Sequence, residues 1–281
     1  WGQVTGTWTL TGFGDEIDPD PVVQLAVLRA LGARHVEVRS AWHTNVVELT
    51  DEQVDRLATL LAQRDMAVSA VASPIGKVDA FDEPGAELER LKRAVTVAHR
   101  LGSRYIRLFS FYRADGVGVH DIRDTVLTRM RAFADLAEQG DVILLHENEK
   151  HIYGDVPTRI LDLIESVGSD ALRVAWDNAN FVQVGVRPFT DGYALLRPYL
   201  EYLQVKDAIA GTGEVVAAGE GDGELLQTLT AMRDDGYAGF ASLEPHLATG
   251  HALGGFSGPA AFGRAARAFA ALTTSIGVRC T

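Results

Sequence analysis

The sequence predicts a closed (β/α)₈ barrel, in which eight parallel strands are each followed by a helix on the outside. The first observation is a strict alternation of short apolar runs with amphipathic segments along the 281 residues. The second is that four of the apolar runs end in a burst of polar residues, where such barrels place their chemistry. The third is that Gly12-Phe-Gly14-Asp15, after the first run, is not the phosphate-binding glycine fingerprint of open doubly wound sheets.

The first half of the chain contains four strand–helix units. Pro19 and Pro21 open the first helix, and Gly32 ends it. Thr50-Asp-Glu-Gln53 is a capping box that starts the second helix. The predicted strands occupy residues 7–13, 35–39, 66–73 and 105–109, and the predicted helices occupy residues 21–31, 54–61, 87–101 and 124–138.

The second half continues the same alternation. The predicted strands occupy residues 141–147, 172–177, 202–207 and 239–243, and the predicted helices occupy residues 159–167, 191–200, 224–234 and 259–272. Each unit takes roughly 25 to 37 residues, a length typical of βα repeats. Because no linker or shift in composition divides the chain, we expect residues 1–281 to form a single barrel domain.

Composition argues against several classes of protein. A formal net charge of −12 disfavours a nucleic-acid partner, which requires a basic surface. The apolar runs fall well short of the roughly 20 residues that a membrane-spanning helix needs, so we expect no membrane partner. Cys280 is the one cysteine, which excludes a disulfide framework and a cysteine-based zinc site. Because residues 1–5 lack the basic start of a signal peptide, we expect a cytoplasmic protein.

Oxygen donors stand at the ends of four consecutive predicted strands. They are Glu147, Asp177, Gln204 and Glu244. A barrel gathers its strand ends around one mouth, so we expect these side chains to converge there. Three carboxylates brought together repel one another, and a divalent cation removes that cost. Three carboxylates with one amide oxygen suit a hard metal such as Mn²⁺ or Mg²⁺.

Each of these residues alone has a less specific explanation. A single Asp or Glu at a strand end is more often a helix cap or a surface ion pair than a metal ligand. Four donors at four successive strand ends favour a site instead. His146 and His246 stand near two of the carboxylates, but we expect strand alternation to turn both away. Residues 219–223 are rich in glycine yet lack the Lys-Ser/Thr ending of a phosphate loop.

Several motifs together resemble the xylose isomerase-like barrel superfamily, and within it the sugar phosphate isomerase/epimerase group. The resemblance covers nearly the whole chain, and its most specific motifs are Glu147 and residues 176–180, 205–207, 219–221 and 243–245. The resemblance implies four metal ligands of the types Glu, Asp, His and Glu. Glu147, Asp177 and Glu244 match three of them, and Gln204 stands where relatives have the histidine.

The glutamine has consequences for the metal and for the reaction. An amide oxygen is a harder donor than imidazole, so we expect Mn²⁺ or Mg²⁺ to be preferred, with Zn²⁺ and Co²⁺ as further candidates. Relatives that dehydrate 3-dehydroshikimate also have a glutamine there, which makes a lyase the alternative to an isomerase. Asn180 replaces a histidine of many relatives and, with the acidic charge, argues against a three-metal endonuclease.

The resemblance implies a metal-dependent isomerase or epimerase of a keto-sugar or a related polyol-ketone. The metal would chelate the carbonyl and a neighbouring hydroxyl and stabilise an enediolate, while Glu147 and Glu244 act as general base and acid. A dehydratase of the 3-dehydroshikimate or inosose type would use the same base and metal. A sugar-binding barrel without activity is the third hypothesis.

Further residues are expected to contact the substrate, a small carbohydrate or a keto-acid. The candidates for its hydroxyl groups are Glu149, Asn178, Lys206 and His246. The candidates for a carboxylate or phosphate, at the ends of earlier strands, are Arg39, Lys77 and Arg107. Barrels of this kind often pair, so a homodimer is also expected.

Overall fold

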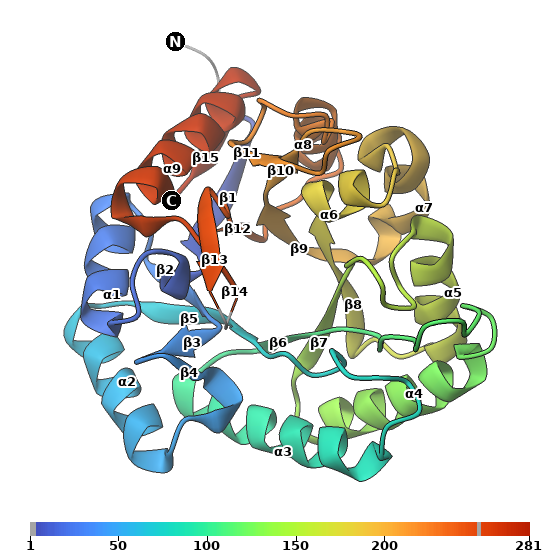
Figure 1. Ribbon diagram of the computed structural model, residues 1–281. Helices are drawn as coiled ribbons and strands as arrows, with labels where there is room; N and C mark the ends of the chain where they lie inside the picture. Colours follow the sequence, from blue (N-terminus) through green and yellow to red (C-terminus); the bar gives the residue numbers. More distant parts are fainter. Residues whose placement is uncertain (1–3, 252–253) are drawn as a thin grey trace.

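The computed structural model describes residues 4–251 and 254–281, and these form the predicted barrel (Figure 1). Its eight parallel strands are β1 (Gly6–Gly12), β2 (His35–Val38), β5 (Ala67–Ala72), β6 (Tyr105–Leu108), β7 (Ile143–Glu147), β8 (Leu172–Asp177), β9 (Leu200–Val205) and β12 (Phe240–Leu243). They follow one another around the barrel in chain order. A parallel bridge between Phe13 and Glu37 joins the ends of β1 and β2 and closes the ring. Near the C-terminus, β15 (Val278–Cys280) pairs with β1.

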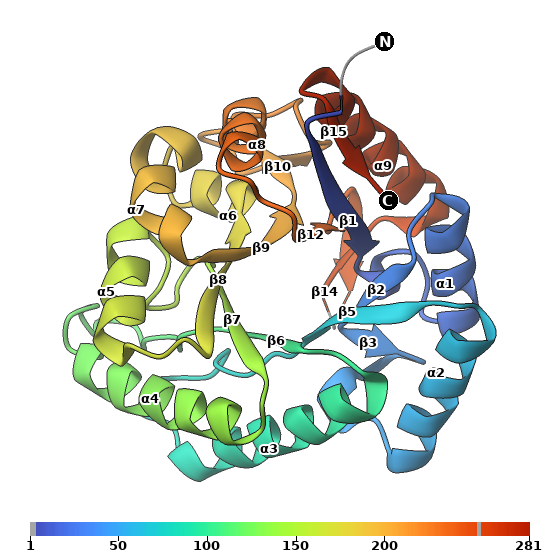
Figure 2. The same ribbon diagram turned by 180° about the vertical axis from the view of Figure 1, so that it is seen from behind.

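Helices cover the outside of the barrel, as Figures 1 and 2 show from opposite sides. They are α1 (Pro21–Ala30), α2 (Asp51–Gln63), α3 (Pro84–Leu101), α4 (Arg123–Gln139), α5 (Pro157–Val167), α6 (Asn178–Gln183), α7 (Ala194–Leu196), α8 (Leu225–Asp234) and α9 (Gly258–Ser275). One large apolar cluster joins their inner faces to the strands, as with Leu91 of α3 and Ile106 of β6. Within residues 4–251 and 254–281, no helix is long and apolar enough to cross a membrane.

Several helices begin or end at the capping residues, prolines and glycines from which they were predicted. Thr50 and Gln53 form the predicted capping box at the start of α2, with both reciprocal hydrogen bonds present. Gly102 ends α3 with a φ of 70°, a left-handed conformation that favours glycine. Asp20 caps α1, and Pro21 occupies the first turn of that helix.

The connection between β8 and β9 differs from the prediction. One helix was expected over residues 191–200, whereas the structure has α6 directly after β8 and then three short pieces, η3 (Pro188–Tyr193), α7 and η4 (Arg197–Tyr199). The helix α6 begins early because the carboxylate of Asp177 accepts a hydrogen bond from the backbone N–H of Asn180 at 3.0 Å. Six residues are too few to show a helical period in the sequence.

Short elements that were not predicted surround the mouth of the barrel. They are the 3₁₀ turns η1 (Gly14–Glu16) and η2 (Val46–Glu48) and the strand pairs β3 (Ser40–Ala41) with β4 (Thr44–Asn45), β10 (Asp207–Ala208) with β11 (Val215–Val216), and β13 (Ala248–His251) with β14 (Gly254–Phe256). They follow β1, β2, β9 and β12, all at the C-terminal ends of these strands. The loops after β5, β6 and β7 complete the rim, and two isolated bridges join them.

Side chains fill the interior of the barrel, and a polar layer lies below the mouth. The hydroxyl oxygens of Thr11 and Ser69 are 2.7 Å apart, and Ser69 is 2.9 Å from the hydroxyl of Tyr202. Tyr202 then donates to Glu37 Oε1 at 2.7 Å. The interior is thus a packed core rather than a pore, as in other barrels of this class.

Candidate active site

Three carboxylates converge at the mouth of the barrel, as predicted. Glu147 ends β7, Asp177 ends β8, and Glu244 follows the last residue of β12. One oxygen atom of each lies within 4.8 Å of the others, and all three residues are buried. A single cation can contact three oxygen atoms at such a spacing, so the triad is a candidate metal site.

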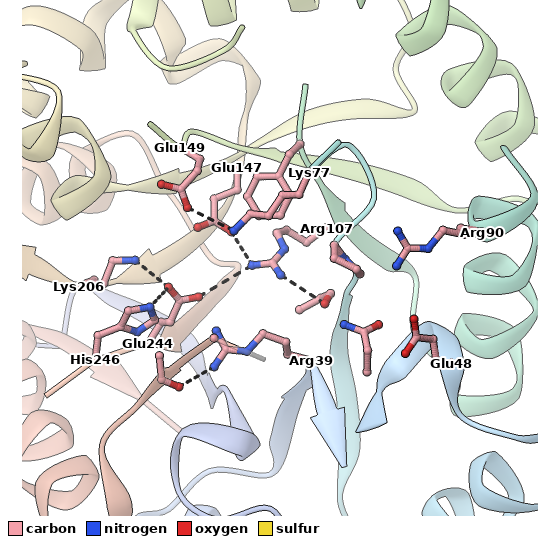
Figure 3. A pocket seen from close by; sticks show the side chains of 16 residues that line it. Arg39, Glu48, Lys77, Arg90, Arg107, Glu147, Glu149, Lys206, Glu244 and His246 are labelled. Carbon is pink, nitrogen blue, oxygen red and sulfur yellow. Dashed lines mark hydrogen bonds and ion pairs between the residues drawn. The ribbon is translucent and has the colours of Figure 1, made fainter. Parts of the chain in front are cut away.

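Two cations, Lys206 and Arg107, lie among these carboxylates, and Figure 3 shows them beside Glu244 and Glu147. Lys206 Nζ is 2.7 Å from Glu244 Oε1 and 2.9 Å from Asp177 Oδ2. Arg107 Nη1 is 2.7 Å from Glu147 Oε2 and 3.9 Å from Glu244 Oε2. When all three carboxyl groups are ionised, their negative charge exceeds the charge of the two cations by one, and a further cation would offset it.

Burial and these neighbours move the pKa values of the three carboxyl groups apart. Burial raises the pKa of Glu147, although Arg107 opposes the change. Burial also raises the pKa of Asp177 to about 7, against the effect of Lys206. At Glu244 burial acts in the same direction, but Lys206 and the other cations around it lower the pKa. Carboxyl groups with different pKa values can take opposite roles in proton transfer.

Gln204 occupies the fourth predicted ligand position, next to Asp177 in the register of β8 and β9. Its amide nitrogen donates to Glu37 Oε2 at 3.3 Å, in the layer below. Its amide oxygen is buried and has no hydrogen-bond partner among the described residues. A buried acceptor without a partner carries a cost that a cation would remove. The donor set therefore fits a hard divalent cation.

Two asparagines hold the triad in place, a role that the sequence analysis missed. Asn180 donates its side-chain N–H to Glu147 Oε1 at 3.2 Å and its backbone N–H to Asp177 at 3.0 Å. Asn148 accepts from the backbone N–H of Asp177 at 3.0 Å and donates to its carbonyl at 2.9 Å. Each asparagine lies within three residues of a predicted metal ligand in the sequence. That closeness is the feature of the sequence from which their role could have been predicted.

A cavity of about 460 Å³ opens above the cluster (Figure 3). This volume lies in the range of small-molecule sites. The predicted residues that line it are Arg39, Lys77, Arg107, Glu147, Glu149, Lys206, Glu244 and His246. Phe109 forms an apolar wall, with Lys77 Nζ at 4.4 Å and the Arg107 guanidinium at 4.6 Å from the ring centroid. The lining residues Asn45, Glu48 and Arg90 were missed, because none of them directly follows a barrel strand.

The two histidines near the triad point in different directions relative to the mouth of the barrel. His146 points away from the mouth as expected, with Nε2 2.8 Å from Ser110 Oγ, and burial lowers its pKa to about 3. The expectation that His246 also turns away is wrong, because the strand ends before it and its φ is 50°. Its Nε2 lies 3.5 Å from Glu244 Oε1, and its Nδ1 lies 3.0 Å from Glu16. Glu16 therefore orients this ring over the triad.

Asn178 does not line the cavity, so the prediction that it contacts the substrate is wrong. Its side chain is fully buried. The amide nitrogen donates to the carbonyl of Gly223 at 2.7 Å and to Thr228 Oγ1 at 3.0 Å, and the amide oxygen accepts from Trp176 Nε1 at 3.0 Å. The polar atoms of the Asn178 side chain are therefore engaged in hydrogen bonds within the protein. These bonds also connect α6 to the loop before α8.

Comparisons with known proteins agree with this geometry. Residues 25–271 match a family model described as xylose isomerase-like TIM barrel. A stretch of 143 residues is 30% identical to the 2-epi-5-epi-valiolone 7-phosphate 2-epimerase of Actinoplanes sp., covering 51% of this chain and 51% of the relative. The match thus spans about half the length of that curated relative.

Solved structures share the fold over almost the whole chain. A D-psicose 3-epimerase aligns with a TM-score of 0.75 at 16% identity, over 96% of this chain and 99% of that one. The probable 3-DHS dehydratase AsbF from Bacillus anthracis aligns with a TM-score of 0.73 at 16% identity, over 94% and 98%. A xylose isomerase-like TIM barrel protein from Mycobacterium smegmatis in complex with magnesium aligns with a TM-score of 0.72 at 18% identity, over 98% and 100%. At these identities the likeness shows the fold alone.

Proposed function

The chain belongs to the xylose isomerase-like TIM barrel family, and from this premise we propose that it is a divalent-metal-dependent isomerase or epimerase of a small polyhydroxylated ketone. The observation that carries the proposal is the buried triad of carboxylates under a cavity of sugar size, together with the amide oxygen of Gln204, which has no hydrogen-bond partner among residues 4–251 and 254–281. The names of two similar proteins, a valiolone phosphate epimerase and a psicose 3-epimerase, support the same class of reaction.

In this proposal Glu147, Asp177, Gln204 and Glu244 hold the cation. A divalent cation bound there would polarise the ketone and stabilise the negative charge that develops on its oxygen. A donor set made only of oxygen atoms suits Mn²⁺ or Mg²⁺ better than Zn²⁺. The magnesium complex of the similar barrel from Mycobacterium smegmatis supports this choice.

Glu147 and Glu244 are the proposed proton carriers. They stand on β7 and after β12, with β8 and β9 between them, so they reach a substrate in the mouth from two sides. One carboxylate removes the proton from the carbon beside the carbonyl, and the other donates a proton to the opposite face. Return to the same carbon inverts it, which is epimerisation, and return to the former carbonyl carbon is isomerisation.

The cations of the cluster support these two carboxylates. Arg107 holds Glu147, and Lys206 holds Glu244, each at 2.7 Å. Such charge-assisted bonds fix the direction of a carboxylate and favour its ionised form. Glu149 and His246 line the cavity, and we expect them to contact substrate hydroxyl groups.

A dehydratase is the second candidate function. The resemblance to relatives that dehydrate 3-dehydroshikimate implies a glutamine at this position, which Gln204 matches, and a probable 3-DHS dehydratase has a similar fold. Such an enzyme would use the same carboxylate as base but expel a β-hydroxyl group as water. Mass spectrometry of the product separates the two, because an epimerase conserves the mass of its substrate and a dehydratase does not.

Elemental analysis tests the ligand set. We expect purified protein to carry about one Mn²⁺ or Mg²⁺ per chain and the Glu244→Gln and Asp177→Asn variants to lose most of it. Glu149→Gln, which changes a carboxylate of the same cavity outside the triad, is the matched control and should retain the metal. Full retention in both triad variants would contradict the proposed site.

Solvent exchange tests the reaction. With metal present, incubation in D₂O should place deuterium on the carbon beside the carbonyl of a ketose that the protein accepts. Glu147→Gln and Glu244→Gln should abolish this exchange. No exchange into any ketose or keto-acid of a broad panel would favour a sugar-binding protein without activity.

A further inference from the structure

Glu16, in the turn η1 after β1, is a fully buried glutamate that lies outside the triad. Its Oε1 accepts hydrogen bonds from the backbone N–H of His246 at 2.8 Å and from the hydroxyl of Ser257 at 3.1 Å. Its Oε2 lies 3.0 Å from His246 Nδ1. A carboxylate only accepts hydrogen bonds, so Nδ1 carries a hydrogen in this contact. Both oxygens of Glu16 therefore face donors.

The same glutamate fixes both ends of the segment that follows His246. The backbone N–H of Ser257 donates to the carbonyl of Glu16 at 2.9 Å. The hydroxyl of Ser257 also accepts from the backbone N–H of Leu247 at 3.0 Å. Leu247 directly follows His246, and Ser257 directly precedes α9. The β13–β14 hairpin thus begins and ends at residues that Glu16 holds.

The backbone and the ring of His246 are both constrained. The residue has a φ of 50°, a left-handed conformation that is uncommon outside glycine. Such conformations persist where the surroundings hold them, and they cluster at functional sites. A Cβ on Gly255 would lie 2.3 Å from three atoms of the ring, so the ring packs directly against the backbone of this glycine. Glu16 and Gly255 together leave the ring little freedom to turn.

Nε2 is the ring nitrogen that remains for a substrate. His246 lines the cavity, and its Nε2 lies 3.5 Å from Glu244 Oε1. Lys206 Nζ is 2.7 Å from the same oxygen, and Figure 3 shows both side chains beside Glu244. A divalent cation on the triad would add positive charge there and would leave the bonds of Glu16 in place. A substrate hydroxyl whose lone pairs face these cations needs an acceptor for its hydrogen.

We infer that Glu16 is a positioning residue for the proposed reaction. It keeps the ring hydrogen of His246 on Nδ1 and so presents Nε2 to the cavity as an acceptor for a substrate hydroxyl beside Glu244. The contact with the substrate rests on the proposed function, whereas the place of the ring hydrogen does not. The two parts are therefore tested by separate measurements.

Nitrogen-15 NMR of the Mg²⁺-loaded full chain, labelled at histidine, shows which ring nitrogen carries the hydrogen. The signals of His246 are those that are missing in His246→Gln. In the buffer of the D₂O exchange assay, we expect a hydrogen on Nδ1 and none on Nε2. A hydrogen on Nε2, with or without one on Nδ1, would overturn the inference and leave the proposed function standing. This measurement needs no variant of Glu16.

Glu16→Gln should move the ring hydrogen of His246 to Nε2. The end of a glutamine has one oxygen that accepts and one NH₂ group that donates. The backbone N–H of His246 can only donate, so the amide oxygen must face it. The NH₂ group then faces Nδ1, which has to accept and leaves the hydrogen on Nε2. A folded variant in which the hydrogen stays on Nδ1 would contradict the role assigned to Glu16.

Deuterium uptake by a ketose distinguishes positioning from a merely structural role. In Glu16→Gln we expect KM to rise roughly tenfold and kcat to change less than about threefold, as when one hydrogen bond to a bound substrate is lost. Glu201→Gln is the matched control, since Glu201 accepts from Tyr105 at 2.7 Å near the start of β9, and KM should not change. A fall in kcat at unchanged KM would overturn the substrate contact. No uptake by the wild type would overturn the proposed function and this contact together.

Elemental analysis of His246→Gln separates a substrate contact from a metal ligand. Histidines that bind metal also donate their second ring N–H to a carboxylate, as His246 does to Glu16. Among the described residues, however, the cluster of ligand atoms within 4.8 Å of one another comprises Glu147, Asp177 and Glu244, without His246. We therefore expect the variant to retain its Mn²⁺. Loss of the metal would make His246 a ligand and overturn the inference.

Discussion

The amide nitrogen of Gln204 donates a hydrogen bond to the carboxylate of Glu37, 3.3 Å away and one layer deeper in the barrel. The contact turns the amide oxygen of Gln204 away from Glu37, and that oxygen has no partner among the described residues. Glu37 is itself held by the hydroxyl of Tyr202 at 2.7 Å. It is therefore a positioning residue for the proposed ligand, as carboxylates behind ligating histidines are in other metal sites.

Glu37→Gln should weaken Mn²⁺ binding by roughly tenfold or more. The hydroxyl of Tyr202 donates to one oxygen of Glu37 and the Gln204 amide nitrogen donates to the other. If the amide oxygen of a glutamine accepts from Tyr202, its NH₂ group faces the Gln204 amide nitrogen, and this contact between two donors favours the opposite orientation of the Gln204 amide. Titration calorimetry with Mn²⁺ measures the change in Kd. Ser69→Ala is the control, because Ser69 contacts Tyr202 of the same network at 2.9 Å. An unchanged Kd in Glu37→Gln would contradict the positioning role.

Gln204→His should change which metal the site prefers. Imidazole is a softer donor than an amide oxygen, so we expect the affinity for Zn²⁺ relative to Mn²⁺ to rise roughly tenfold. Competition between the two ions, followed by elemental analysis after dialysis, measures the ratio. If the variant retains metal and the ratio stays the same, Gln204 is not a ligand.

Arg107→Ala should impair both stability and turnover, even with an uncharged ketose. Arg107 binds Glu147 at 2.7 Å and donates to the carbonyls of Ala72 and Ser73 at 3.3 Å. Removing one partner of a buried ion pair costs about 3–5 kcal/mol of unfolding free energy. Urea denaturation and kcat for a free ketose measure the two effects.

The control for this variant is Arg173→Ala, which breaks a more exposed pair with Glu201 at 3.6 Å. It should cost about 1 kcal/mol or less. An arginine whose only role is to hold a substrate carboxylate would leave the turnover of an uncharged ketose unchanged. That result would exclude the supporting role proposed for Arg107.

The barrel and its triad could be predicted because they depend on local patterns and on one rule of topology. All eight barrel strands overlap apolar runs that are visible in the sequence. Once a closed barrel is assumed, the residues that follow these runs must meet at one mouth, which brings Glu147, Asp177 and Glu244 together.

The residues below the triad and those at the rim of the cavity could not be predicted in this way. Glu37 lies in a short strand and resembles a solvent-facing position, and only the strand register shows that it is fully buried inside the barrel. Glu48 comes from a 3₁₀ turn after a two-residue strand, and Arg90 comes from the middle of a helix. No periodic pattern in the sequence indicates that Glu48 or Arg90 faces the cavity. Only the tertiary packing brings the two residues together there.

An ion pair outside the site provides a test of the fold itself. Arg123 at the start of α4 binds Asp162 of α5 through two hydrogen bonds of 2.8 and 2.7 Å. The bonds from Arg123 lower the pKa of Asp162 to about 2, from an ordinary value of 3.8. Because the pKa of Asp162 is lower in the folded state, the ion pair stabilises the folded state at pH values above the ordinary pKa of 3.8. This contribution to stability is lost as the pH falls through about 2.

Asp162→Asn should therefore lower the unfolding free energy at pH 7 by about 1–2 kcal/mol, a range that allows for the partial exposure of the pair. The difference from the wild type should stay constant down to about pH 5 and shrink between pH 5 and pH 3, as the unfolded chain takes up its proton. Urea denaturation across this range measures both proteins. Asp135→Asn, at an exposed position of α4, is the control and should follow the wild type. A difference at pH 3 as large as that at pH 7 would show that lost packing, rather than the charge of Asp162, causes the destabilisation.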